Sequence, residues 1–281
     1  MAEPRAPSNL AIRLLTAAVA IPLLLLLIYK GPPWGLFLLV CVVTFQAGVE
    51  LFGMTHPEDP TTQHVGAVAT VAVSASVYFG AADARVLMVV LVFAPIFGTL
   101  FTLVRLGDMK TAALRALALG VGPLFCGGPI SLLAVMRRDH GDRVGPGLVV
   151  FCLLVAWLSD TGGYFAGRFL GKRKLYEAVS PKKTVEGAIG GLLGSAMGGV
   201  LAHYVFSPGL PLVPVVGVSV VAGALGQAGD LGESLLKRST GVKDSGQIVP
   251  GHGGILDRVD ALMVVAAVVY VFSVFFLRVE P

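Results

Sequence analysis

The chain has 281 residues, of which 55% are hydrophobic and only 14% are charged. A soluble domain carries about 25% charged residues, so this composition excludes an ordinary soluble protein. Apolar runs long enough to cross a bilayer as helices recur along the whole chain, and transmembrane β-strands would be shorter and alternating. The composition predicts an all-α, polytopic membrane protein that forms a single integral membrane domain over 1–281. The modest net charge of +4 gives no sign of a nucleic-acid partner.

The hydrophobic runs predict about nine transmembrane helices. Glycines and prolines are frequent in the fifth, which predicts a kink or a break there. Residues 1–145 would hold variable N-terminal spans, and residues 146–281 the catalytic spans and loops. The predicted spans are about 11–29, 34–53, 64–80, 85–104, 112–136, 146–169, 185–206, 211–236 and 259–277.

The first apolar run has an alternative interpretation as a secretory signal, because Arg5 and Arg13 precede it. The run over 14–28 is long for a signal-peptide core, so we expect a retained first helix. The cysteines lie singly in apolar runs. We expect buried, inert thiols, with neither a disulfide framework nor a zinc site.

Lysine and arginine predict the orientation in the membrane. The N-terminus and the connections after the fourth, sixth and eighth spans hold 15 of them, whereas the opposite side holds 6. This excess predicts that the N-terminus and the charged connections face the cytoplasm. The compact size fits a bacterial inner-membrane protein.

The densest cluster of both charge signs lies over 234–260, between two apolar runs. Charge placed next to membrane-spanning segments is costly and usually marks a site. Asp230, Glu233 and Lys237 share one helical face, and Asp257 and Asp260 share another. Acids from two helix ends can converge on Mg²⁺, which takes one or two carboxylates and leaves its other positions to water and phosphate. The alternative is that the acids only neutralise nearby lysines and arginines.

The loop between these two helices is rich in glycine, notably at Gly253 and Gly254. Its exposed amides, together with the positive end of the ninth helix, could bind an anion. Metal-binding acids, basic residues and a glycine-rich turn are what phosphoryl or nucleotidyl transfer requires. His252 could bind phosphate, assist proton transfer or simply form hydrogen bonds within the loop.

A second polar stretch runs over 159–187. Ser180 followed by Pro181 predicts a helix start, with Ser180 as the N-cap. Lys182 and Lys183 would then oppose the helix dipole, which indicates an anionic partner. Asp160 lies within an apolar run and is expected to face the same cavity. Glycines repeating every fourth residue on both sides of this stretch predict closely packed helices.

Three motifs carry a resemblance to a known family. The first is Ser234-x-Leu236-Lys237-Arg238, then Lys243-Asp244-x-Gly246, then Pro250-x-His252-Gly253-Gly254-Ile255-x-Asp257-Arg258-Val259-Asp260. The others are Asp160-Thr161-Gly162-Gly163-Tyr164-Phe165 and Ser180-Pro181-Lys182-Lys183-Thr184-Val185-Glu186-Gly187. They resemble the phosphatidate cytidylyltransferases, also called CDP-diacylglycerol synthases. Val249, where the family usually has Leu, Ile or Phe, is a conservative departure.

The resemblance implies a reaction of CTP with phosphatidic acid that gives CDP-diacylglycerol and pyrophosphate. It also implies a cytosol-facing polar cavity, dependence on Mg²⁺ with a possible monovalent cation such as K⁺, and a homodimer in the bilayer. Metal ligands would be Asp230, Asp257 and Asp260. Catalytic residues would be Asp230, Lys243, Asp244, His252, Asp257 and Arg258. Substrate-binding residues would be Ser180, Lys182, Lys183, Thr184, Lys237, Arg238, Gly253 and Gly254.

Two alternatives stay open from the residues alone. A CTP-dependent polyprenol or phytol kinase has similar requirements but would release CDP. A transporter also uses intramembrane acids and broken helices, although its polar residues would gather at mid-depth rather than at one face.

Overall fold

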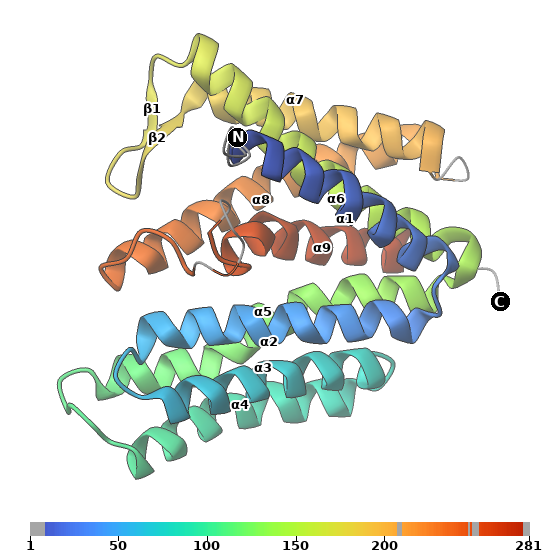
Figure 1. Ribbon diagram of the computed structural model, residues 1–281. Coiled ribbons are helices and arrows are strands. Elements are labelled where there is room, and N and C mark those ends of the chain that lie inside the picture. Colours follow the sequence, from blue (N-terminus) through green and yellow to red (C-terminus); the bar gives the residue numbers. More distant parts are fainter. Residues whose placement is uncertain (1–8, 207–209, 247, 249–252, 278–281) are drawn as a thin grey trace, which may run out of the picture.

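The computed structural model describes residues 9–206, 210–246, 248 and 253–277. Within these ranges the chain forms nine α-helices, one π-helical turn and one short hairpin (Figure 1). The elements are α1 (Asn9–Lys30), α2 (Pro33–Thr55), α3 (Pro60–Gly80), α4 (Ala84–Val104), α5 (Ala112–Asp139), α6 (Gly141–Leu170), β1 (Lys174–Tyr176), β2 (Ser180–Thr184), α7 (Val185–Leu201), η1 (Ala202–Phe206), α8 (Leu212–Ser239) and α9 (Leu256–Phe276).

The helices coincide with the hydrophobic runs, which confirms the predicted all-α, polytopic architecture. Seven helices in the described ranges are long and apolar enough to cross a membrane. The α7 span continues through η1, and the two helices outside the seven are α3 and α1, which contributes a shorter apolar helix over Ala17–Lys30. Short connections make sequence neighbours antiparallel. The connection between α2 and α3 ends at Asp59, which caps α3 by accepting a hydrogen bond from Thr62 N at 3.2 Å.

The predicted break in the fifth run is absent, since α5 is continuous over Ala112–Asp139 despite Pro123 and Pro129. Its glycines instead let neighbouring helices approach. A Cβ on Gly120 would lie 2.8 Å from the Pro95 backbone of α4, and one on Gly127 would strike the Thr70 backbone of α3. These contacts hold α5 among α2, α3 and α4, and its partners support the helix around each proline.

The glycine rows of α6 and α7 pack face to face, as predicted. A Cβ on Gly187 would lie 3.0 Å from the Gly163 carbonyl oxygen and 3.2 Å from the Gly167 Cα. Such close backbone approach is possible only with small residues at this spacing. These two helices form one wall of the site described below.

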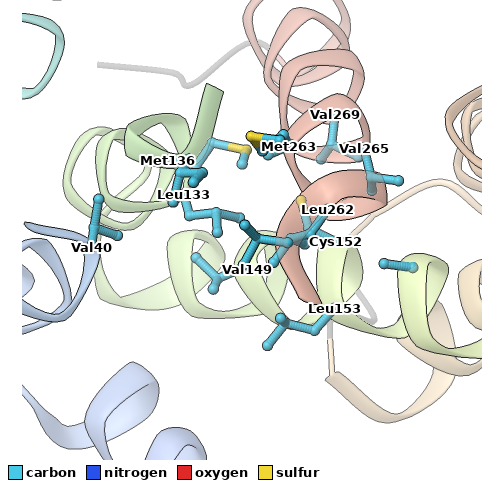
Figure 2. Packing of buried hydrophobic residues seen from close by; sticks show 14 of the residues in the cluster. Val40, Leu133, Met136, Val149, Cys152, Leu153, Leu262, Met263, Val265 and Val269 are labelled. Atoms are coloured by element: carbon cyan, nitrogen blue, oxygen red, sulfur yellow. The ribbon is translucent and has the colours of Figure 1, made fainter. Parts of the chain in front are cut away.

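The apolar core joins the two halves of the chain where α5, α6 and α9 meet (Figure 2). Leu133 and Met136 of α5 face Val149 and Cys152 of α6, with Met263 of α9 closing the cluster. All three cysteines are free: Cys126 and Cys152 are buried, and Cys41 is half-buried. The prediction of separate, unpaired thiols is therefore confirmed.

The region over 174–184 corrects one prediction. Ser180–Thr184 is a β-strand antiparallel to Lys174–Tyr176 rather than a helix start. A residue before proline prefers extended backbone, and here β1 supplies the pairing that this conformation needs. The N-cap of α7 is Thr184, whose Oγ1 accepts from Gly187 N at 3.1 Å. Lys182 and Lys183 consequently extend from a hairpin.

Both motif-bearing segments lie at the same end of the helix bundle, at the left of Figure 1. The β1–β2 hairpin, the end of α8 and the start of α9 gather there, together with the connections after α2 and α4. The connections after α1, α3 and α5 lie at the other end. This arrangement agrees with the grouping by lysine and arginine content.

Candidate functional site

A cavity of about 660 Å³ opens between α6, α7, α8, α9 and the hairpin. It unites the motif over 159–187 with the motif over 234–260, as the sequence predicted for Asp160. The sequence-predicted residues that line it are Asp160, Lys182, Lys183, Thr184, Lys237, Asp230, Asp244, Asp257, Arg258 and Asp260. Acidic and basic side chains thus line one open cavity at one end of the bundle.

One ion pair joins the hairpin to α8. The Lys183 Nζ lies 2.5 Å from the Asp230 Oδ2, and each side chain is a little over a quarter exposed. Because β2 carries Lys183 over the cavity, a strand outside the helix bundle supplies the cation nearest this carboxylate. A surface pair is worth little, but a partly enclosed pair is screened less by solvent.

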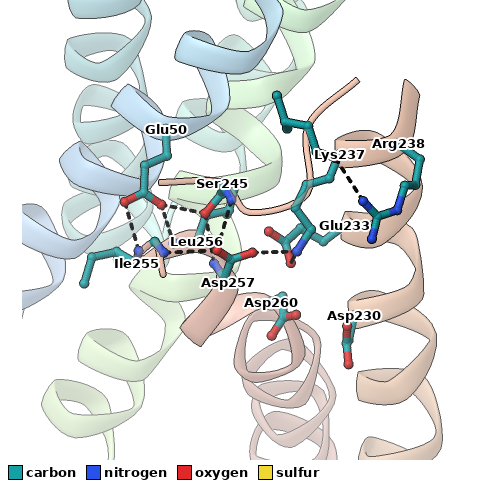
Figure 3. A network of polar contacts seen from close by, with 12 residues as sticks. Glu50, Asp230, Glu233, Lys237, Arg238, Ser245, Ile255, Leu256, Asp257 and Asp260 are labelled. Atoms are coloured by element: carbon teal, nitrogen blue, oxygen red, sulfur yellow. Dashed lines mark hydrogen bonds and ion pairs between the residues drawn. The ribbon is translucent and has the colours of Figure 1, made fainter. Parts of the chain in front are cut away.

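A second ion pair joins α8 to α9 (Figure 3). Lys237 donates to the Asp257 Oδ1 at 2.5 Å and to the Glu233 Oε2 at 3.2 Å. Lys237 is 8% exposed and Glu233 is fully buried. Glu233 lies one turn before Lys237, so the face predicted from their spacing is confirmed.

The other oxygen of Asp257 fastens the loop before α9. Its Oδ2 accepts from Ser245 N and from Gly254 N, both at 3.0 Å. Gly253 has φ +83°, a conformation that favours glycine and that turns the chain back toward the carboxylate. Asp257 is therefore held from both sides, with one oxygen available toward Lys237 and the cavity.

The acids of α6, α8 and α9 form one wall of the cavity. Figure 3 shows Asp230 and Asp260 with their carboxylates close together below Glu233. Asp160 lines the same cavity from α6. Among the described residues, the Oε1 of Glu233 is buried without a hydrogen-bond donor and lies beside the Asp260 carboxyl, which accepts from the amide of Ala261 at 2.6 Å.

This donor set suits a hard cation that is shared with a substrate. Among the described residues, no three acidic, histidine or cysteine side chains surround one point closely enough to hold an ion alone. Mg²⁺ does not require that, because it binds through one or two carboxylates and takes substrate phosphates and water as its other ligands. The underpartnered oxygens of Glu233 and Asp260 fit such an ion.

Several predicted site residues lie outside this cavity. Lys243 is exposed and does not line it. Arg238 donates to the carbonyl oxygens of Val179 at 3.4 Å and Val242 at 3.2 Å, so it braces the hairpin against the loop. Ser180 pairs with Tyr176 in the hairpin. His252 and Val249 lie outside the described residues.

The predicted anion site at the start of α9 needs a correction. The amides of Ile255 and Leu256 already donate to Glu50 of α2, at 2.9 and 2.8 Å, and the amide of Gly254 donates to Asp257. The protein's own carboxylates therefore occupy the position that we expected for phosphate. Neither Gly253 nor Gly254 lines the cavity.

Glu50 was missed in the sequence. It lies 195 residues before Ser245, whose hydroxyl donates to it at 2.9 Å. The available signal was an acid alone within the long apolar run over 34–53, a placement that is costly unless the acid has a specific partner. Sequence spacing gives no indication of which distant donors satisfy it.

The fold and the cavity define an integral-membrane helical protein with a charged site suited to anionic substrates. The family model described as the cytidylyltransferase family matches residues 11–276. The chain belongs to the cytidylyltransferase family.

Two relatives have the same printed name. The chain is 43% identical over 156 residues to the phosphatidate cytidylyltransferase of Brucella suis biovar 1 (strain 1330), covering 55% of this chain and 56% of that protein. It is 47% identical over 117 residues to the phosphatidate cytidylyltransferase of Staphylococcus haemolyticus (strain JCSC1435), covering 42% and 45%. The chain spans about half the length of the curated relatives that it matches.

Proposed function

We propose that this protein is a phosphatidate cytidylyltransferase, which converts CTP and phosphatidic acid into CDP-diacylglycerol and pyrophosphate. The observation that carries the proposal is the cavity itself. It brings Lys183 and Lys237 together with Asp230, Asp257 and Asp260 at one end of the bundle. Membership of the cytidylyltransferase family supports the same reaction.

The reaction forms a bond between an oxygen of the lipid phosphate and the α-phosphorus of CTP. It breaks the bond from that phosphorus to the β-phosphate, which leaves as pyrophosphate. Both reactants are anions, so the enzyme must mainly position them and offset their repulsion. The cations that line the cavity and would supply this offset are Arg168, Lys182, Lys183, Lys237 and Arg258.

Mg²⁺ fits this site, where Asp230, Asp257 and Asp260 would hold it. When bound, it would neutralise charge on the triphosphate and on the departing pyrophosphate. A monovalent cation such as K⁺ is a further proposal from the family resemblance, as are roles for Lys243, Asp244 and His252.

The two ion pairs explain how the substrate-free site can contain both signs of charge. Lys183 and Lys237 neutralise Asp230 and Asp257 before substrate enters. Asp230 and Asp257 would help to hold the metal, and Lys183 and Lys237 would then be available to bind phosphate oxygens of CTP. Each of these side chains would then face an opposite charge both with and without substrate, which limits the free-energy cost of burying it.

The cavity would face the cytoplasm from the cell (inner) membrane, and the protein would be a homodimer. The excess of lysine and arginine at the cavity end supports this orientation. CTP is a cytoplasmic nucleotide, whereas phosphatidic acid reaches the site from the bilayer. The homodimer rests on the family resemblance.

Product analysis tests the proposal. The full-length protein in detergent is incubated with α-labelled CTP, phosphatidic acid and Mg²⁺, and the label is followed between aqueous and lipid phases. We expect label in the lipid phase, pyrophosphate release, and loss of both on adding EDTA. Label recovered as CDP with an isoprenoid alcohol would indicate a kinase instead. No consumption of CTP with any acceptor would favour a transporter.

A further inference from the structure

Glu50 does not line the cavity, yet its carboxylate holds the segment that carries Asp257. Figure 3 shows it reaching from α2 toward the start of α9. Its Oε1 accepts from Ile255 N at 2.9 Å, and its Oε2 accepts from Leu256 N at 2.8 Å and from the Ser245 hydroxyl at 2.9 Å. The residue is only 5% exposed.

These contacts account for the charge of Glu50. The first amides of a helix have no partner within the helix and carry positive partial charge, so a carboxylate there is stabilised. Gln46 of the preceding turn donates to the Glu50 Oε1 at 3.1 Å and adds a further partner. Among the described residues, the donors to this carboxylate from beyond α2 lie in the loop or at the start of α9.

The packing around Glu50 also accounts for two motif glycines. A Cβ on Gly246 would lie 2.8 Å from the Glu50 Cδ, and one on Gly254 would strike the Glu50 Oε2 and the Ser245 Oγ. Both glycines are therefore required to let the loop close over the carboxylate. The glycine-rich motif serves an internal carboxylate at these positions.

Glu50 and Asp257 form a connected set through Ser245. The Ser245 hydroxyl donates to Glu50, while the Ser245 amide donates to Asp257. Asp257 then projects its other oxygen toward Lys237. The direction of the Asp257 carboxylate depends on the loop position that Glu50 fixes.

We propose that Glu50 is a positioning residue, which ties the N-terminal helices to the catalytic loop and orients Asp257 for its role in nucleotidyl transfer. The inference rests on the proposed function for its kinetic consequence, but its structural part does not. Glu50 itself touches neither the cavity nor the reacting atoms.

Glu50→Gln is the direct test, because the amide keeps the shape and loses the charge and one acceptor. We expect kcat to fall about 10-fold or more, as for loss of a charge-assisted hydrogen bond, with the KM for CTP changing less than about 3-fold. Glu58→Gln is the matched control, since Glu58 is an exposed acid just beyond the same helix. An unchanged kcat in Glu50→Gln would overturn the proposal.

Hydrogen exchange separates this inference from the proposed function. In Glu50→Gln, one of the two amides, of Ile255 or Leu256, loses its acceptor and the other keeps only a neutral one, so we expect faster exchange in peptides covering 253–258 and unchanged exchange in α6 and α7. Faster exchange there would support the role of Glu50 in holding the start of α9, even if the wild type consumed no CTP. Equal exchange in the two proteins would refute it.

A second variant distinguishes a positioning role of Glu50 from a role in folding alone. Glu50→Ala leaves a space beside two unpaired amides, and acetate can enter it as a replacement carboxylate. We expect acetate to restore at least about a third of the lost turnover, whereas the same concentration of chloride does less. Loss of activity without acetate rescue, together with global loosening of exchange, would assign Glu50 to folding alone and contradict the proposal.

Discussion

Cations that pair within the protein lie at both ends of the helix bundle, but they have different kinds of partner. Arg137, 2% exposed, donates to the carbonyl oxygens of Ile28 at 2.8 Å and Gly31 at 3.3 Å, at the end of α1. Lys183 and Lys237, at the other end, pair with carboxylates that line the cavity. A cation on helix-terminal carbonyls completes the backbone. A cation on a cavity carboxylate can exchange that partner for a substrate.

The largest effect is expected at the cavity end. Asp257→Asn removes the negative charge that Lys237 and the proposed metal share, and it weakens the acceptor for Ser245 N and Gly254 N. We predict a loss of turnover of about 1,000-fold. Nucleotide transfer at wild-type rate in this variant would remove Asp257 from the site. Unchanged elution in size-exclusion chromatography serves as the folding control.

Lys183→Ala should have the next largest effect. It removes a phosphate-binding cation and leaves Asp230 without its partner in a partly enclosed cavity. We predict that kcat/KM for CTP falls about 100-fold, mainly through KM, and that Lys183→Arg recovers part of it. Steady-state kinetics against CTP measures this. Equal kinetics in Lys183→Ala and wild type would mean that the ion pair only anchors the hairpin.

Arg137→Met tests the opposite end. The substitution leaves the carbonyls of Ile28 and Gly31 buried without their donor, at a cost of about 2 to 3 kcal/mol in unfolding free energy. The salt bridge to Asp142 adds little, because that side chain is 88% exposed. Thermal unfolding in detergent should show the loss, while activity per folded molecule stays near wild type. A loss of activity without a loss of stability would contradict a purely structural role for Arg137.

The smallest predicted effect concerns pH and His56, in the connection after α2. Burial, with the nearby Arg115 charge, lowers the pKa of His56 to about 4 from its ordinary 6.5. The unfolded chain binds the proton first as pH falls, so stability is lost from about pH 6.5 down to about 4. We predict a loss of about 2 kcal/mol between pH 7 and 5.

Thermal unfolding of wild type and His56→Gln over this pH range checks the prediction, because the variant should lack this part of the pH dependence. Asp59 makes a suitable contrast. The guanidinium of Arg105 holds the pKa of Asp59 well below its usual range, so its contribution is lost only in stronger acid. An identical pH slope in wild type and variant would show that His56 does not titrate in this window.

Hydropathy was sufficient to predict the nine helices because a bilayer requires spanning segments to be helical and about 20 residues long. Spacing was sufficient to place Glu233 with Lys237 and the glycine rows of α6 and α7, since both follow from helical periodicity. The hairpin over 174–184 could not be predicted in this way. Its strands are short, and a proline such as Pro181 is compatible both with a helix start and with an edge strand.

Glu50 shows the other limit of the sequence. Its donors Ile255 and Leu256 lie more than 200 residues away. Both donate through the backbone amide, which every residue except proline has, so no sequence pattern distinguishes them. The glycine-rich turn was expected to bind a substrate anion, but its amides donate to carboxylates of the protein itself. Local patterns indicate what a segment can bind and leave open which partner reaches it.

The account depends most on the cavity being a nucleotidyl-transfer site. CTP labelled differently at the α- and γ-phosphates, supplied with phosphatidic acid and Mg²⁺, tests this in one measurement on wild type and Asp230→Asn. We predict that α-label enters lipid and γ-label appears as pyrophosphate in equal amounts, and that both fall together in the variant. Transfer of γ-label to lipid, or equal amounts of product in wild type and variant, would contradict the account.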